Sequence, residues 1–237
     1  MIITTETQVC DIAVEYPTAI PVLERFGIDF CCGGKHTLAE ACTQRDVDVV
    51  PVLEELERQQ RKTGAPEAHW QKAPLKELAD YIVSRHHVFT REQIQLIAGL
   101  MTKVEARHGA DHTVVPQIGK VFAVVSAELA HHFICEETIL FPYIGKLGGG
   151  QQAALPPMFG SVEQPIARMM ADHDQAGAEL RELRGLTGNY TPPTAACPTW
   201  RALYRALEDL EQDLHQHIHL ENNILFPRAL AQAKGTA

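Results

Sequence analysis

The chain has 237 residues, of which 45% are hydrophobic and 22% charged, as in a globular protein with one large domain or a medium domain and a small companion. Its net charge of −9 argues against nucleic acid as a partner, because nucleic-acid binding needs a basic surface. No apolar run approaches the roughly 20 residues that span a bilayer, and the N-terminus lacks the pattern of a secretory signal. We therefore expect a soluble cytoplasmic protein with no membrane partner, whose six cysteines are mostly reduced.

Three short helices are predicted in the first part of the chain. The first covers residues 17–26 and ends at Gly27, a residue suited to the left-handed turn that follows a helix. Thr37 and Glu40 form a capping-box pattern that opens the second helix. A third helix is expected over residues 48–61, with Asp48 as its cap.

Four longer helices are predicted further along, where apolar residues recur at steps of three and four. Representative positions of the four stripes are Val83, Ile94, Ile97 and Met101; Ile118, Val125, Ile139 and Tyr143; Ile166, Met169, Leu180 and Leu183; and Leu203, Leu207, Leu210 and Leu214. Short connections predict antiparallel neighbours in a four-helix bundle. The fold class is therefore expected to be all-α. We predict a small N-terminal helical domain containing cysteines over residues 1–62, a linker that includes 63–67, and the antiparallel bundle over residues 73–233.

In each stripe a histidine replaces an apolar residue, and in the second and fourth stripes a glutamate follows one turn later on the same side. These candidate metal ligands are His87, His132, Glu136, His173, His217 and Glu221. The two halves of the chain repeat, because Leu-Phe-Pro follows each His–Glu pair at the same offset. The lone histidine precedes its pair by 45 residues in one half and by 44 in the other. This repeat predicts a pseudo-twofold bundle with all the candidate ligands at one level.

Two metal ions would explain this set of side chains. Four histidines and two glutamates facing one core are costly to bury without a partner, whereas bound metal turns the imidazoles and carboxylates into ligands. The set is larger than a tetrahedral zinc takes and contains no thiolate. It therefore predicts two iron ions per chain, bridged by Glu136 and Glu221 and by an oxo or hydroxo group, with manganese or zinc as minor alternatives. Each iron would keep room for a small ligand such as O2 or NO.

Other polar residues near the stripes are weaker candidates. His86 and His131 lie one position off the stripe and are expected at the surface or just outside the ligands. His108 lies too far along the first long helix to be a ligand unless that helix breaks. Glu128 lies one turn before His132 on the side that faces the metal, and Asp172 lies beside His173. They could orient the ligands or line a path for protons or small molecules; the alternative is that they are solvated carboxylates.

Cys31 and Cys32 are adjacent and precede Gly33-Gly34-Lys35. Adjacent cysteines can form only a strained ring or act as two exposed thiols. Lys35 and the amide groups of the helix that starts after Thr37 are expected to favour thiolates. We therefore predict a redox or iron-transfer role for the pair, the alternative being a chance occurrence in a turn. The other cysteines, Cys10, Cys42, Cys135 and Cys197, show no metal-binding spacing.

Two segments of the chain resemble signatures of the Repair of Iron Centres family, the di-iron proteins of the YtfE, ScdA and DnrN type. Asp29-Phe30-Cys31-Cys32-Gly33-Gly34-Lys35 resembles the N-terminal signature, and residues 220–230 (LENNILFPRAL) resemble the C-terminal one. The resemblance covers nearly the whole chain and implies the same six ligands, an N-terminal domain of the ScdA-N type and a hemerythrin-like bundle. The bundle would have one histidine fewer than the oxygen carriers use. Asp172 is a departure, because the family is expected to have a glutamate before the third histidine.

The resemblance implies a stress protein that repairs iron-sulfur clusters damaged by nitric oxide or oxidants, by iron donation or by redox chemistry at a di-iron centre. Its partners would be damaged iron-sulfur proteins and an unidentified electron donor. One alternative is an enzyme that reduces NO at the di-iron site, which leaves open whether the protein is an enzyme. Another is a module that binds or senses O2 or NO, although such a carrier has no need of adjacent cysteines. The oligomeric state does not follow from the sequence; a homodimer is one option.

Overall fold

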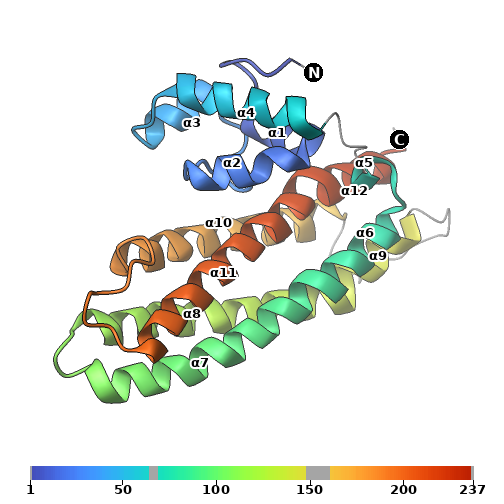
Figure 1. Ribbon diagram of the computed structural model, residues 1–237. Helices are drawn as coiled ribbons and strands as arrows, with labels where there is room; N and C mark the ends of the chain where they lie inside the picture. The colour runs from blue at the N-terminus through green and yellow to red at the C-terminus, as the bar shows by residue number, and fades with distance from the viewer. Residues whose placement is uncertain (1, 64–68, 148–160, 236–237) are drawn as a thin grey trace. The chain divides into compact units, whose positions relative to one another are not determined.

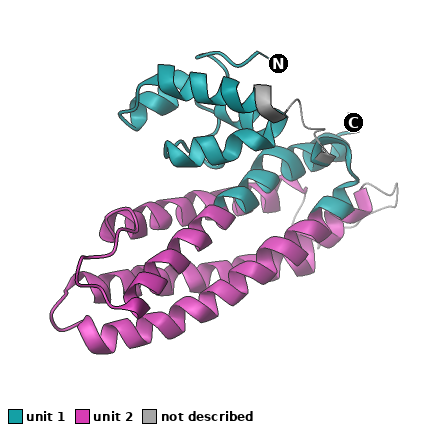
Figure 2. Ribbon diagram, viewed as in Figure 1, with its two compact units in different colours: residues 1–78, 215–237 teal, residues 79–214 magenta. Residues whose placement is uncertain are grey.

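The computed structural model describes residues 2–63, 69–147 and 161–235, which are predominantly helical and contain no β-strand (Figure 1). Two compact units are present: Met1–Leu78 with His215–Ala237, and Ala79–Leu214 (Figure 2). The all-α fold class is therefore confirmed. Most of the expected linker, residues 64–67, lies outside the described residues. The expected domain boundaries, 1–62 and 73–233, stay a prediction.

Local signals in the sequence explain the N-terminal helices of the first unit. The helices are α1 (Val9–Glu15), η1 (Pro17–Ala19), α2 (Ile20–Arg25), α3 (Leu38–Gln44) and α4 (Val49–Thr63). Gly27 follows α2 with a φ of 67°, in the left-handed region where glycine is favoured. Thr37 and Glu40 form the expected capping box at the start of α3. Asp48 accepts a hydrogen bond from the Val50 N–H at 3.0 Å, so the expected caps of both helices are confirmed.

The core of the first unit includes residues from both ends of the chain. Leu23, Leu38 and Phe30 pack in one apolar cluster with Ile218, which lies in α11 (Pro198–Leu220). Burying each of these side chains contributes about 1.5–3 kcal/mol relative to leaving it in water. The Arg228 guanidinium of α12 (Phe226–Ala233) also donates hydrogen bonds of 2.6 Å to the carbonyl of Trp70, within α5 (His69–Lys72), and to that of Ala73, just after it. The N-terminal helices and the last helices of the chain thus form one packed unit.

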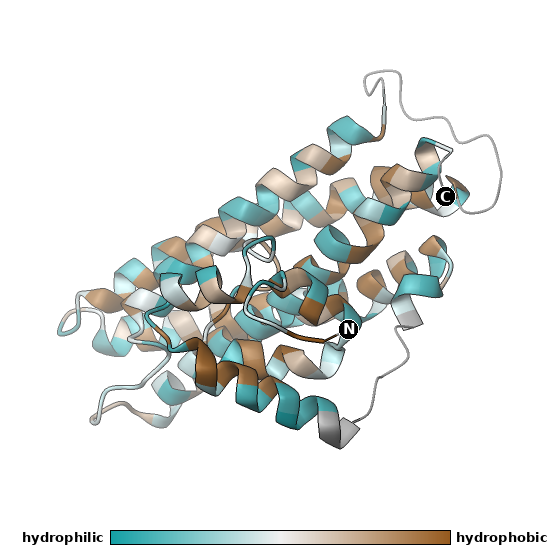
Figure 3. Ribbon diagram, turned by 90° about the horizontal axis from the view of Figure 1, so that it is seen from above, coloured by the Kyte–Doolittle hydropathy of each residue, from teal (hydrophilic) through white to brown (hydrophobic). Residues whose placement is uncertain are grey.

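The second unit is a four-helix bundle. Its helices are the end of α6 (Leu75–Tyr81) with η2 (Ile82–His87) and α7 (Val88–His108); α8 (Val114–Cys135) with η3 (Glu136–Leu140) and α9 (Phe141–Leu147); α10 (Glu163–Leu186); and the first part of α11. Apolar and polar residues alternate along these helices (Figure 3), as expected for helices with one buried face. The core includes Ile97, Ile118, Leu180 and Leu207, which come from all four helices. The four expected stripes are therefore confirmed as helices.

The helices contain three π-helical segments that the regular stripes do not predict: η2, η3 and η4 (Glu221–Leu225), the last following α11. A π turn holds one residue more than an α turn, so the buried face shifts by one position. In each segment the positions four and five residues after the first are accordingly both buried: His86 and His87 after Ile82, Leu140 and Phe141 after Glu136, and Leu225 and Phe226 after Glu221. The expectation that Val83, Ile139 and Tyr143 lie in the core is therefore wrong, and these residues are only partly buried.

By length and composition alone, the helical stretch Val114–Leu147 is long and apolar enough to cross a membrane, with a mean hydropathy of 1.3. It is the one such stretch among the described residues. The sequence-based expectation concerned uninterrupted apolar runs and did not detect it. A single such helix is weak evidence for a membrane span, because the core helix of a bundle can have the same length and apolar composition. Here the stretch contains two buried polar residues, His132 and Glu136.

Candidate metal centre

Four of the expected ligands lie together within the bundle unit. Glu136 is completely buried, and its two carboxylate oxygens lie 3.4 Å from His87 Nε2 and 3.1 Å from His132 Nε2. The Nε2 atoms of His132 and His173 are 3.1 Å apart. One ligand atom each from His132, Glu136 and His173 lies within 4.8 Å of the others, which is close enough to hold a metal ion. Residues from three helical segments far apart in the sequence are thus brought together.

The other two expected ligands form a matching pair in the first unit. His217 Nε2 and Glu221 Oε1 are 3.0 Å apart, and both side chains are buried. In each half of the repeat the histidine lies in the last turn of an α-helix and the glutamate opens a π segment. The internal repeat seen in the sequence therefore extends to the local geometry of the two His–Glu pairs.

Carboxylates outside the cluster determine which ring nitrogen the histidines present. His87 Nδ1 lies 2.7 Å from Glu137 Oε1, and His132 Nδ1 lies 3.6 Å from Asp172 Oδ2. The hydrogen bond with Glu137 favours a proton on Nδ1 of His87, and the nearby negative charge of Asp172 acts in the same direction on His132. The lone pair of each Nε2 is then directed toward the cluster. The expectation that Asp172 orients a ligand agrees with this contact. Glu137 was not identified from the sequence, because the π turn that brings it to His87 gives no signal of its own.

Aromatic rings enclose His87. Its imidazole stacks on Phe133 with centroids 4.0 Å apart and lies 5.8 Å from the Phe141 ring. Phe141 is the first residue after the η3 segment, so the π turn contributes to this packing. The rings exclude water from one side of the cluster and restrict the imidazole to one orientation.

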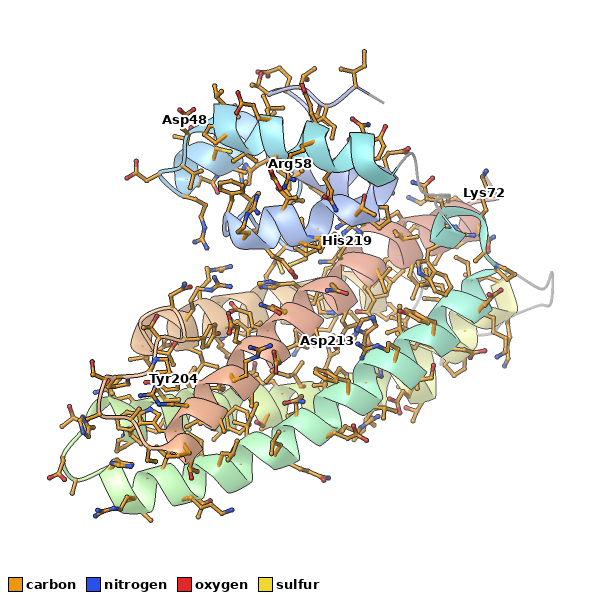
Figure 4. All side chains as sticks on the ribbon, in the orientation of Figure 1. Asp48, Arg58, Lys72, Tyr204, Asp213 and His219 are labelled. Carbon is orange, nitrogen blue, oxygen red and sulfur yellow. The ribbon has the colours of Figure 1, made fainter. Side chains whose placement is uncertain are left out.

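His86 lies just outside the ligands, which is the second of the two positions expected from the sequence. It is buried, and its Nδ1 lies 3.0 Å from the Asp213 carboxylate of α11, which is labelled in Figure 4. The π segment η2 turns both His86 and His87 inward, whereas a regular helix would separate them by 100°. Asp213 also lies 3.4 Å from Arg85. These contacts join the first and fourth helices of the bundle close to the ligands.

The remaining candidates do not join the cluster. The helix α7 runs unbroken to His108, whose Nε2 lies 3.4 Å from Cys197 Sγ. His131 is exposed, as expected. Glu128 is also exposed, which agrees with the alternative of a solvated carboxylate. Its charge acts on Glu179, whose pKa is raised first by burial and then by the charge of Glu128.

Cys31 lies in a different environment from the one expected. It is buried, with its Sγ 3.9 Å from Cys32 Sγ and 3.3 Å from Asp29 Oδ1. The contact with Cys32, then burial, then the negative Asp29 raise the pKa of Cys31 well above its usual value. The expectation that Lys35 favours a thiolate is therefore wrong for Cys31. Burial alone would raise the pKa of Asp29, but hydrogen bonds from Gly33 and Cys31 lower it on balance, so the carboxylate stays charged.

The donor set of the bundle cluster suits a cation with imidazole and carboxylate ligands. The Nε2 atoms of His132 and His173 face each other at 3.1 Å, and a cation between them would accept both lone pairs. No thiol belongs to either ligand group among the described residues. Histidine and carboxylate ligands projecting inward from a four-helix bundle are typical of di-iron carboxylate proteins.

Comparisons with known proteins agree with this geometry. Residues 78–229 match the Hemerythrin HHE cation binding domain, and residues 5–60 match the ScdA_N domain of unknown function, DUF542. The bundle is thus a hemerythrin-type cation-binding domain. The chain is 39% identical over 221 residues to the iron-sulfur cluster repair protein YtfE of Citrobacter koseri and 40% identical to that of Escherichia coli O81 (strain ED1a). Both alignments cover 93% of this chain and 95% of the relative. The chain therefore belongs to the YtfE family of iron-sulfur cluster repair proteins.

Proposed function

We propose that the two ligand groups form one di-iron centre inside the bundle. Support comes from α11, a continuous helix whose Leu210 and Leu214 belong to the core of the bundle unit. His217 and Glu221 follow at steps of three and four, which keeps them on the same helix face as the two leucines. In the proposed centre Glu136 and Glu221 contact both irons, and each iron takes two of the four histidines.

The function proposed for this centre is the repair of damaged iron-sulfur clusters in the cytoplasm. The observation that carries it is the similarity to proteins named for this activity, which extends over 93% of the chain and includes both the cysteine domain and the bundle. Free cysteines fit a reducing compartment. When bound, the irons would supply an iron source and redox chemistry. The proposed partners are damaged iron-sulfur proteins, an electron donor, and NO or O2 as small ligands.

The chain's own residues have distinct parts in this proposal. Glu137 and Asp172 keep the proton on Nδ1 of His87 and His132, so that each Nε2 stays a ligand. Phe133 excludes water from the imidazole of His87. Cys31 and Cys32 lie on a separate loop and are proposed to pass iron or electrons to the client.

The decisive experiment compares recovery of a damaged iron-sulfur dehydratase with multiple-turnover consumption of NO. We expect the iron-loaded protein to restore the dehydratase. Glu136→Ala should fail to restore it, because that variant lacks a proposed bridging ligand. His131→Ala is the matched control, because His131 is an exposed residue on the same helix. Sustained NO consumption without dehydratase recovery would show an NO-reducing enzyme instead, and the absence of both would leave a binding module.

A further inference from the structure

The loop that carries Cys31 and Cys32 is anchored through its neighbour Phe30. The Phe30 ring is buried and contacts two histidines of α11 edge-on, with centroid distances of 6.1 Å to His215 and 5.6 Å to His219. These residues all belong to the first unit. The loop preceding the dithiol therefore packs on the last turns of α11.

Asn223 adds a polar contact to this apolar anchor. Its side-chain amide donates to the Phe30 carbonyl at 3.1 Å and lies 2.9 Å from His219 Nδ1. A neutral imidazole has one acceptor nitrogen, so at this distance His219 Nδ1 can accept the second amide proton of Asn223. One amide group thus binds both the loop and the helix.

The anchoring residues alternate with the proposed metal ligands along the helix. His215, His219 and Asn223 recur at steps of four, and His217 and Glu221 lie between them (Figure 4 labels His219). Residues two positions apart point to nearly opposite sides of a helix. Glu221 and Asn223 are, moreover, the first and third residues of the π segment η4. The same short segment therefore carries a proposed metal ligand on one side and the loop anchor on the other.

We propose that Asn223 and His219 are positioning residues that latch the Cys31–Cys32 loop to the helix bearing His217 and Glu221, and that metal binding and latch closure stabilise each other. The consequence for the thiols rests on the role proposed above for the cysteine pair. With the latch closed, Cys31 is shielded from solvent beside Asp29. Opening the latch exposes Cys31 to clients.

Coupling to the metal follows from the shared segment. A metal that holds Glu221 fixes the backbone of η4 and with it the direction of Asn223. Loss of the metal frees Glu221, loosens η4 and opens the latch. By thermodynamic reciprocity, an open latch must also weaken metal binding at Glu221. Cys31 would therefore become accessible when the proposed centre gives up iron.

The experiment measures the rate of alkylation of Cys31 by iodoacetamide, with each modified cysteine assigned by mass spectrometry. Iron-loaded parent protein, Asn223→Leu, Asn223→Asp and the control Gln216→Leu are compared at one pH. Gln216 is an exposed residue of the same helix. We expect alkylation at least about fivefold faster in both Asn223 variants, as for the loss of one hydrogen bond, and no change in the control. Iron-free parent protein should also react faster than iron-loaded parent protein.

The latch is contradicted if Asn223→Leu is alkylated at the rate of Gln216→Leu. If Asn223→Leu fails to hold iron, Asn223→Asp decides, because it keeps the side-chain shape but cannot donate to the Phe30 carbonyl. A parental rate for Asn223→Asp then overturns the proposal. Equal rates with and without iron would overturn the coupling. None of these readouts requires repair activity, so failure of the latch can be distinguished from failure of the proposed function.

Discussion

Single residues outside the ligand set govern how the histidines are presented. Glu137 contacts His87 Nδ1 at 2.7 Å and is itself bound by the Arg91 guanidinium at 2.9 Å. The carboxylate therefore fixes both the tautomer and the ring orientation of His87, while the arginine holds the carboxylate in place. Such outer contacts affect metal affinity without being metal ligands.

Replacing Glu137 with glutamine tests this role. The amide keeps the size of the side chain but is a weaker hydrogen-bond acceptor for the Nδ1 proton of His87. We therefore expect both irons still to bind, and the iron held by His87 to be released about 10–100-fold faster. The measurement is the rate of iron release to a strong chelator. Glu92→Gln is the matched control, because Glu92 is an exposed carboxylate of α7, next to Arg91 in the chain. Parental release rates in Glu137→Gln would rule out the proposed orientation.

At the scale of elements, local sequence signals predicted the longer helices but neither α1 nor the π segments. Gly27 and the Thr37–Glu40 capping box act within a few residues, so the sequence alone was enough to predict them. A π turn requires only one extra residue, and its trace is a pair of adjacent buried positions, four and five residues further along. That pair cannot be recognised before the buried positions are known. For the same reason Glu137 was missed and two positions were left open for His86, although the neighbouring His–Glu spacing was clear.

The environment of Cys31 shows a second limit of sequence reasoning. Lys35 is close in sequence, but the groups that determine the state of the thiol are Cys32, the surrounding apolar core and Asp29. The core depends on packing between Phe30 and Ile218, which are far apart in the chain. Tertiary contacts of this kind leave no spacing pattern, whereas the repeated ligands do.

Deleting Thr138 from η3 tests the function of the π turns. Thr138 is exposed, and its removal would return the segment to a regular α-helix in which Leu140, Phe141 and Ile144 can still reach the core. We expect helical content by circular dichroism to be retained and most of the bound iron to be lost, because Glu136 and Glu137 both lie in the rewound segment and lose their directions toward the histidines.

A deletion in α10 provides the control for this experiment. That helix has no π segment, so removing the exposed Ala178 shifts Leu180 and Leu183 out of the core. Each leucine withdrawn from the core costs about 2–5 kcal/mol, so this deletion should lower the unfolding temperature steeply. Similar iron content in the Thr138 deletion and the parent would show that the π turn is not needed for the site.

At the scale of the whole molecule, the cysteine loop and the ligands are expected to have separable functions. Cys31 and Cys32 are not among the ligand groups. Replacing both with serine should therefore leave iron content and the visible spectrum nearly unchanged, while dehydratase repair falls sharply. Repair at the parental rate would exclude a role for the thiols. Loss of iron from this variant would instead place the cysteines in the metal site.

The most direct test of the central claim is metal analysis of the purified protein combined with Mössbauer spectroscopy. The proposed centre, with Glu136 and Glu221 bridging, predicts about two irons per chain and the diamagnetic ground state of an antiferromagnetically coupled ferric pair. Glu221→Ala should lose the pair or convert it to uncoupled iron, because a bridging ligand is removed. One zinc and no iron per chain, or uncoupled iron in the parent protein, would contradict the proposed di-iron centre.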